Sequence, residues 1–355
     1  MGAHKNSSKV SPKPKSTTLK FLLDLDSKHN CNGNPERQEI LSVISYCTYY
    51  IFTFTDPLES PFHQNQKRDK LTKLLYIIKS LKKPLPDQIL SPLFCMIWKN
   101  LFRTLPPPNS PAAACFFPED DDLTYSPTPA WPHLYLVYDI LLVLLTELEE
   151  KTLSKYINGS FIHNMLALFE SEDPRVRQVL KTAYHKMYSR LHVSRPCMRN
   201  AMGEIFLDYI YEAERKHYGI GDLLEILGTI INGFSVPLKE EHRVFLMRVL
   251  VPLHRPKEMH AYHKQLAYCI TKCSNSWNSQ VAERALYVWN NERFVKMVSE
   301  AIDDVFPLIV EGIERNLKGH WSRSVGYFST FMRLQFILAG ACTCKDDHLF
   351  QMGCF

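Results

Sequence analysis

The stretch GIGDLLEILGTIINGFSVPLKEEH, from Gly219 to His242, decides the fold of this chain. Its first half carries leucine and isoleucine at the three- and four-residue spacing of one helix face. Asn232-Gly233 then closes the helix, because both residues tolerate a left-handed cap. Pro237 bars a simple continuation, and a second helix opens at Lys239. Two antiparallel helices joined by a short polar corner are one unit of an α-solenoid.

Comparable helix pairs recur at a period of about 40 residues, which is the period of HEAT-type repeats. We therefore predict an all-α fold, an α-solenoid of stacked HEAT-like helix pairs over residues 36–338, with a proline-rich and acidic loop at 106–129. Residues 1–35 are rich in lysine, serine and proline, which predicts a disordered basic tail. Residues 339–355 are interpreted as a divergent C-terminal tail.

Composition excludes several classes of protein. The net charge of +5 is too small to indicate nucleic acid binding, which requires a clustered basic face. The most apolar run, from Leu134 to Leu145, is shorter than the ~20 residues that span a bilayer and carries Asp139, so we expect a buried helix and no membrane insertion. The first 20 residues are polar, so no signal peptide is expected.

The ten cysteines are scattered, most of them inside apolar helical segments, as is typical of buried thiols in a reducing compartment. Cys342, Cys344 and His348 have the spacing of half a zinc site, but structural zinc takes four ligands and no second half is apparent. We therefore expect no metal, no cofactor, and a cytoplasmic and/or nuclear location.

Catalytic motifs are also missing. The sequence holds no H-E-x-x-H, no G-x-S-x-G and no G-x-x-x-x-G-K. Gly219 and Gly221 begin a G-x-G, but Leu224 stands where the third glycine would be and no strand precedes it. The sequence indicates a protein that is not an enzyme.

Several helix faces carry residues suited to peptide binding. The candidate residues are His185, Lys186, Tyr188, Arg195, Ile226, Ile230, Lys239 and His242. Because successive helix pairs stack side by side, these faces are expected to line one trough with an apolar slot and positively charged edges. The alternative remains open that the two isoleucines are plain inter-helix core and the basic residues ordinary solvated charges.

Five motifs resemble the signature of the B-prime regulatory subunits of protein phosphatase type 2A. They are Gly219–His242, Asn100–Leu105 (NLFRTL), Ala130–Leu134 (AWPHL), Leu168–Arg175 (LFESEDPR) and Gln280–Leu286 (QVAERAL). The motifs keep the order of that family. The resemblance implies a pocket, at the candidate residues, for short motifs of the pattern Leu-x-x-Ile-x-Glu. Lys186 departs from the family, which has arginine there, and lysine lacks the planar fork that binds a carboxylate through two bonds.

The resemblance implies a substrate-recruiting regulatory subunit of a serine/threonine phosphatase holoenzyme. Such a subunit would assemble with the phosphatase scaffold subunit and catalytic subunit, and would select client phosphoproteins that carry short linear motifs. Acidic residues such as Glu204 and Asp208 argue against a continuous basic surface, so no nucleic acid partner is expected. The alternative is a truncated solenoid adaptor or decoy that binds client motifs without assembling with the phosphatase core.

The family is longer than this chain in its later half, by about one repeat or more. One helical segment, from Tyr262 to about Cys273, lies between Leu253 and the helix that begins near Gln280. We expect this segment to be a hybrid helix, spliced across the gap, whose apolar face fits neither neighbour well. The gap also predicts weaker holoenzyme assembly, with motif binding largely kept.

Overall fold

The computed structural model describes residues 35–52, 61–80, 85–103, 130–212, 217–234, 239–274, 279–319 and 322–338. Within these ranges every regular element is helical, which confirms the predicted fold class. The predicted basic tail, the loop at 106–129, the C-terminal tail and the trio Cys342, Cys344 and His348 lie outside the described residues. No helix in the described ranges is long and apolar enough to cross a bilayer.

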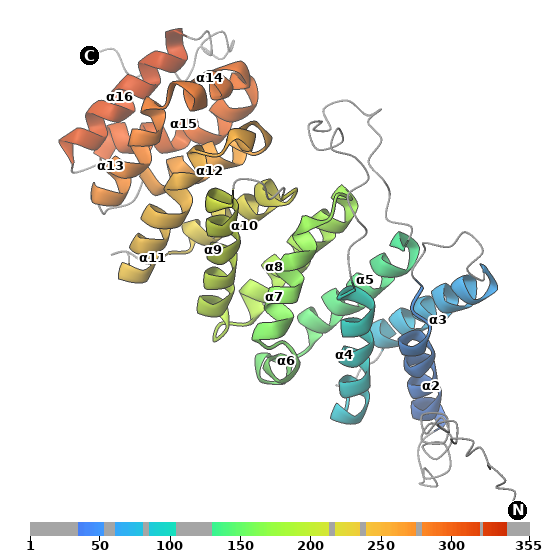
Figure 1. The fold of residues 1–355 in the computed structure, drawn as a ribbon. Coiled ribbons are helices and arrows are strands. Elements are labelled where there is room, and N and C mark those ends of the chain that lie inside the picture. Colours follow the sequence, from blue (N-terminus) through green and yellow to red (C-terminus); the bar gives the residue numbers. More distant parts are fainter. Residues whose placement is uncertain are drawn as a thin grey trace, which may run out of the picture.

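The helices follow one another along an elongated, curved molecule, from α2 at one end to α16 at the other (Figure 1). They form two rows. The first row is α3 (Pro61–Ser80), α5 (Trp131–Glu147), α8 (Pro174–Arg190), α10 (Ile220–Asn232), α12 (His263–Ser274) and α15 (Ile302–Gly319). The second row is α2 (Pro35–Tyr49), α4 (Asp87–Leu101), α6 (Glu150–Tyr156), α7 (Gly159–Ala167), α9 (Arg195–Tyr211), α11 (Glu240–Phe245), α13 (Ser279–Tyr287) and α16 (Arg323–Leu338).

Short helical turns join these elements. A wide turn, η3 (Leu246–Leu250), continues α11, and α14 (Glu292–Glu300) packs against α12 and α15 beside the rows. The tighter turns are η2 (Leu168–Glu170), η4 (Val251–His254), η5 (Lys257–Ala261) and η6 (Val288–Asn290). The chain crosses from one row to the other between successive units, which is the alternation of an α-solenoid.

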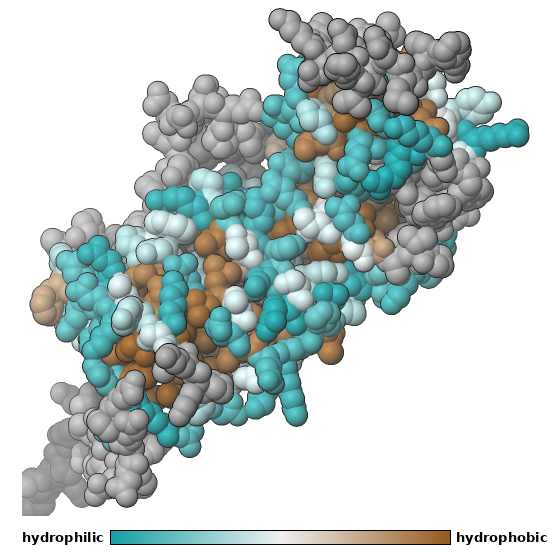
Figure 2. Space-filling view, turned by 180° about the vertical axis from the view of Figure 1, so that it is seen from behind, coloured by the Kyte–Doolittle hydropathy of each residue, from teal (hydrophilic) through white to brown (hydrophobic). Residues whose placement is uncertain are grey.

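The core lies between the two rows and runs without interruption from Ile40 to Met332. On the face shown in Figure 2, hydrophobic side chains appear between hydrophilic ones along the length of the molecule and do not gather into one large patch. A solenoid buries its apolar surface in this way, since each unit covers the next and the core grows with the number of units.

A buried polar contact joins the first helices. Lys67 of α3 is only 2% exposed, and its Nζ donates to the carbonyl oxygen of Tyr50 (2.7 Å) and to Oδ1 of Asn100 (2.5 Å). Nδ2 of Asn100 in turn donates to the carbonyl oxygen of Cys47 (3.1 Å). Burial lowers the pKa of Lys67 to about 8. A buried ammonium group requires oxygen acceptors, and this explains why the NLFRTL motif begins with an amide.

The helix at the gap packs better than expected. α12 covers nearly the residues predicted for it, but Leu266, Cys269 and Ile270 are fully buried against neighbours in both rows. The prediction that its apolar face fits neither neighbour is therefore wrong. α12 belongs to the first row and α13 to the second, so the alternation of rows continues through this point. Because helices of the two rows still alternate on both sides of the gap, each helix there still packs against an apolar neighbour.

Candidate functional site

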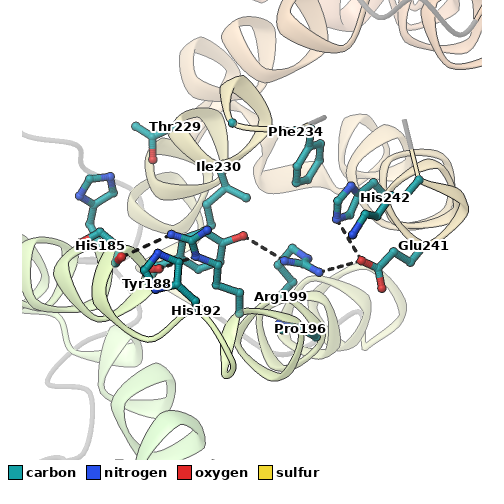
Figure 3. A pocket seen from close by; sticks show the side chains of 14 residues that line it. His185, Tyr188, His192, Pro196, Arg199, Thr229, Ile230, Phe234, Glu241 and His242 are labelled. Carbon is teal, nitrogen blue, oxygen red and sulfur yellow. Dashed lines mark hydrogen bonds and ion pairs between the residues drawn. The ribbon is translucent and has the colours of Figure 1, made fainter. Parts of the chain in front are cut away.

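A pocket of about 480 Å³ lies where α8, α9, α10 and the first turn of α11 meet (Figure 3). Six of the eight candidate residues line it: His185, Tyr188, Arg195, Ile230, Lys239 and His242. The size falls within the range of ordinary ligand pockets in proteins. The structure therefore brings together side chains from four different helices, as the stacking argument predicts.

Two candidate residues do not line the pocket. Ile226 lies one turn before Ile230 on α10 and is buried like Ile230, at 2% and 4% exposure, but only Ile230 lines the pocket. Lys186 follows His185 on α8, and the next position on a helix points about 100° away. Lys186, the position at which the family has arginine, therefore does not line the pocket.

Eight further residues line the pocket and were not predicted: Ser189, His192, Pro196, Arg199, Thr229, Gly233, Phe234 and Glu241. Arg199 follows Arg195 by four residues on α9, so it shares a helix face with Arg195 and could have been found from that spacing. Phe234 and Gly233 come from the turn after α10. Gly233 has φ −90°, so the left-handed cap expected at Asn232-Gly233 is not adopted.

The orientation of α8 is set at its first turn, within the LFESEDPR motif. Oδ1 of Asp173 accepts a hydrogen bond from the backbone nitrogen of Arg175 (3.0 Å), and Pro174 occupies the first helical position. Asp173 is also bridged by the guanidinium of Arg175 (2.8 Å). A side-chain cap and a proline both favour a helix start at this point. His185 and Tyr188 then lie in the last two turns, facing α9 and α10.

Arg195 closes the corner between α8 and α9. Its Nε donates to the carbonyl oxygen of Tyr188 (2.9 Å), its Nη2 donates to that of Ser189 (3.3 Å), and its guanidinium lies 5.2 Å from the centre of the Tyr188 ring. Much of its hydrogen-bonding capacity is therefore used within the protein. Arg195 holds Tyr188 in the pocket wall and also contributes positive charge.

His242 is a buried ring at the opposite side of the pocket. It is 7% exposed and stacks on Phe234, with 3.9 Å between ring centres and 6° between ring planes. Burial, followed by the nearby charge of Arg199, lowers the pKa of His242 below its usual value. The lowered pKa favours the neutral form of the ring.

The remaining charges give the pocket a cationic rim with one acid in it. Arg199 donates from Nη1 to the hydroxyl of Tyr188 (3.1 Å) and from Nη2 to Oε1 of Glu241 (3.0 Å). Lys239 and His185 line the pocket with exposed side chains. With Tyr188, Ile230 and Phe234 as apolar surface, the arrangement suits an extended peptide that carries both aliphatic and acidic side chains.

Comparison with known proteins agrees with the resemblance of the motifs. Residues 26–272 and 269–336 match the family described as protein phosphatase 2A regulatory B subunit (B56 family). The chain belongs to this family. The match covers most of the chain, and the B56 relatives are named as regulatory subunits, so the protein is a non-catalytic, regulatory one.

Individual B56 relatives show the extent of the similarity. The B' epsilon isoform of the 57 kDa regulatory subunit of Arabidopsis thaliana is 36% identical over 349 residues, covering 80% of this chain and 70% of the relative. The B' beta isoform of the same plant is 35% identical, covering 85% and 73%. The 56 kDa delta isoform of Homo sapiens is 35% identical, covering 82% of this chain and 58% of the relative.

The comparison also locates the gap. The two blocks that match the B56 family meet at residues 269–272, inside α12. The alignment with the B' epsilon isoform runs over 349 positions although only 80% of this chain takes part, so that relative carries residues inside the aligned range without a counterpart here. This B56 chain therefore lacks residues that the relative has, and their place in the later half of the family stays a prediction.

Proposed function

We propose that this B56 chain is the substrate-recruiting subunit of a protein phosphatase 2A holoenzyme, and that its pocket binds short Leu-x-x-Ile-x-Glu-like motifs in client phosphoproteins. The observation that carries the proposal is the presence of an apolar wall and a cationic rim in one pocket of peptide size. Membership of the family supports the regulatory part of the proposal.

The apolar wall and the cationic rim of the pocket would bind different parts of the motif. Aliphatic side chains of the motif would pack on Tyr188, Ile230 and Phe234, and each buried anchor contributes about 1.5–3 kcal/mol. The glutamate of the motif would form charge-assisted hydrogen bonds with rim residues such as Lys239 and His185. Apolar anchors would supply affinity, and the rim would select acidic peptides.

Recruitment explains how a subunit without catalytic groups changes the outcome of a reaction. A client held in the pocket is present at a high effective concentration beside the catalytic subunit, so its phosphorylated residues are dephosphorylated before those of unbound proteins. The catalytic subunit would break the phosphate ester, and this chain would choose the client. We propose that it does so in the cytoplasm or the nucleus.

Peptide titration tests the proposal. A fluorescent Leu-x-x-Ile-x-Glu peptide is titrated with the parent, a Lys239→Ala variant and a Lys99→Ala control. Both lysines are exposed, but Lys99 lies on α4, away from the pocket. We expect about two- to fivefold weaker binding for Lys239→Ala and a change below twofold for the control, as for one partly exposed charge contact. Absence of binding by the parent, or equal loss in both variants, overturns the proposal.

Arg195→Ala is a poor choice of variant for this titration. Because Arg195 bonds to the carbonyl oxygens that end α8, its removal would change the α8–α9 corner as well as the charge of the pocket.

The gap in the later half favours a second candidate function. A solenoid that keeps the pocket but lacks part of the surface downstream of it would bind clients without the phosphatase core. Such a protein would be an adaptor or decoy that withholds clients from dephosphorylation. The two functions differ in whether the scaffold and catalytic subunits bind to this chain.

A further inference from the structure

Glu241 is the one acid among the residues lining the described pocket, and it lies in the first turn of α11. Its Oε1 is 3.0 Å from Nη2 of Arg199 and 3.2 Å from Nε2 of His242 (Figure 3). The contact with His242 is within ion-pair distance but lacks hydrogen-bond geometry. One carboxylate oxygen therefore occupies the place between these two side chains, which we call the Arg199–His242 corner.

The three side chains of the corner differ in burial. The side chain of Arg199 is 11% exposed and His242 is almost fully buried, whereas the side chain of Glu241 is 55% exposed. A buried guanidinium requires a negative partner, while a half-exposed carboxylate is readily solvated. Of the three groups, Glu241 is consequently the one that moves into water at least cost.

His242 gives a second reason to expect an incoming group at the corner. Both of its ring nitrogens are buried, and neither makes a hydrogen bond within the described part of the chain. Buried polar atoms are ordinarily hydrogen-bonded, so a ligand that reaches the ring satisfies a group that the ligand-free pocket leaves unsatisfied. Arg199 stays in place during such an exchange, because its Nη1 remains bonded to the hydroxyl of Tyr188.

We propose that Glu241 is a specificity-determining residue that occupies the Arg199–His242 corner in the ligand-free pocket and competes there with an acidic group of the bound peptide. This inference rests on the proposed function, namely that the pocket binds acidic peptides. The ligand anion takes the place of the Glu241 carboxylate beside Arg199, and Glu241 turns into solvent. Because one carboxylate replaces another, a single ligand carboxylate gains little at this corner, whereas a more highly charged group gains more.

A matched pair of glutamates makes the proposal testable. Glu240 and Glu241 are neighbours in the same helical turn, but Glu240 pairs with Arg243 and does not line the pocket. Glu241→Gln and Glu240→Gln each remove one negative charge from this turn and keep the side-chain shape. Binding is measured for Leu-x-x-Ile-x-Glu peptides with one aspartate placed in turn at each x position, and for the matching asparagine peptides.

We expect Glu241→Gln to tighten the binding of at least one aspartate peptide by about two- to fivefold, as for release of one partly exposed ion pair. The asparagine counterpart should change less than twofold, and Glu240→Gln should change neither peptide by more than that. Equal thermal unfolding midpoints for the parent and both variants establish that the fold is kept.

The failures of the two proposals are distinguishable. If the parent binds the peptides but Glu241→Gln weakens them, leaves them unchanged or matches Glu240→Gln, then Glu241 does not compete for the corner and the inference is overturned alone. If neither the parent nor the two variants bind any of the peptides, the proposed function is overturned and the inference with it.

Discussion

Arg103 and His133 belong to two different signature motifs, and both contact one short segment after α2. Nη1 of Arg103 donates to the carbonyl oxygen of Phe52 (3.0 Å), and the ring of His133 lies 5.7 Å from the Phe52 ring. Nε2 of His133 is 2.9 Å from the carbonyl oxygen of Gln64. The sequence identified both motifs, but it could not show that they converge, because these hydrogen bonds join residues 51 and 69 positions apart.

The pocket also combines residues that helical spacing predicts with contacts that it cannot predict. Helical spacing placed His185 and Tyr188 on one face and Ile230 on another, and the structure brings these faces together. The spacing to Arg195 could have placed Arg199 on the pocket face, but its pairing with Glu241 could not be predicted, because that contact joins residues 42 positions apart. Only Ile230 of the predicted isoleucine pair lines this pocket, a difference between the two positions that helical spacing does not show.

His133 should make stability depend on pH. Burial lowers its pKa to about 4, from an ordinary value of 6.5. The folded state therefore binds fewer protons than the unfolded state between these values, and stability falls as the pH decreases from 6.5 to 4. We expect a loss of about 2–3 kcal/mol between pH 6.5 and 4.5 from this group. Urea unfolding at both pH values measures it, against a His133→Asn variant as control. An equal pH dependence in the variant would contradict the assignment.

At the scale of single helices, two side-chain caps begin new helices inside stretches of continuous apolar periodicity. Between residues 150 and 167 the structure has two helices, α6 and α7, because Oδ1 of Asn158 accepts from the nitrogen of Phe161 (3.0 Å) and starts a new helix. Asn291 similarly starts α14, a helix separate from α13, because its Oδ1 accepts from the nitrogen of Phe294 (3.1 Å). In both places apolar periodicity hides a side-chain cap that only the backbone geometry reveals.

Two glycines should respond to alanine in opposite directions. A Cβ on Gly219, at the start of α10, would lie 2.5 Å from the carbonyl oxygen of Phe169, and backbone atoms there cannot move aside cheaply. A Cβ on Gly326, inside α16, would meet nothing within 4 Å. We expect Gly219→Ala to lower the free energy of unfolding by about 1–3 kcal/mol, the usual cost of overpacking. Gly326→Ala should raise it by about 0.5–1 kcal/mol through helix propensity. Urea unfolding of both variants checks the signs, and a neutral Gly219→Ala would show that α10 does not pack on η2 as described.

At the scale of the whole molecule, a ladder of polar contacts crosses the first row and continues past the gap. Nε of Arg177 on α8 donates to Asp222 on α10 (2.9 Å), and Lys264 on α12 donates to Asp304 on α15 (2.8 Å). Between them, Gln265 on α12 donates to Glu225 on α10 (3.4 Å). The gap therefore shortens the solenoid without interrupting the contacts between successive helices. The pocket helix α10 still packs against α12.

Shortening should affect partners that bind along the molecule more than ligands that bind in the pocket. A stable protein–protein interface needs roughly 800 Å² from each partner, so removing helices from a long contact surface reduces assembly, while the pocket depends on α8 to α11 alone. We expect less than stoichiometric co-elution with purified scaffold and catalytic subunits on size exclusion, together with binding of a Leu-x-x-Ile-x-Glu peptide. The human 56 kDa delta isoform at the same concentration is the control, since it is the longer relative. Equal, stoichiometric co-elution of both proteins would show that the later half of the family is dispensable for assembly, and would remove the case for a decoy.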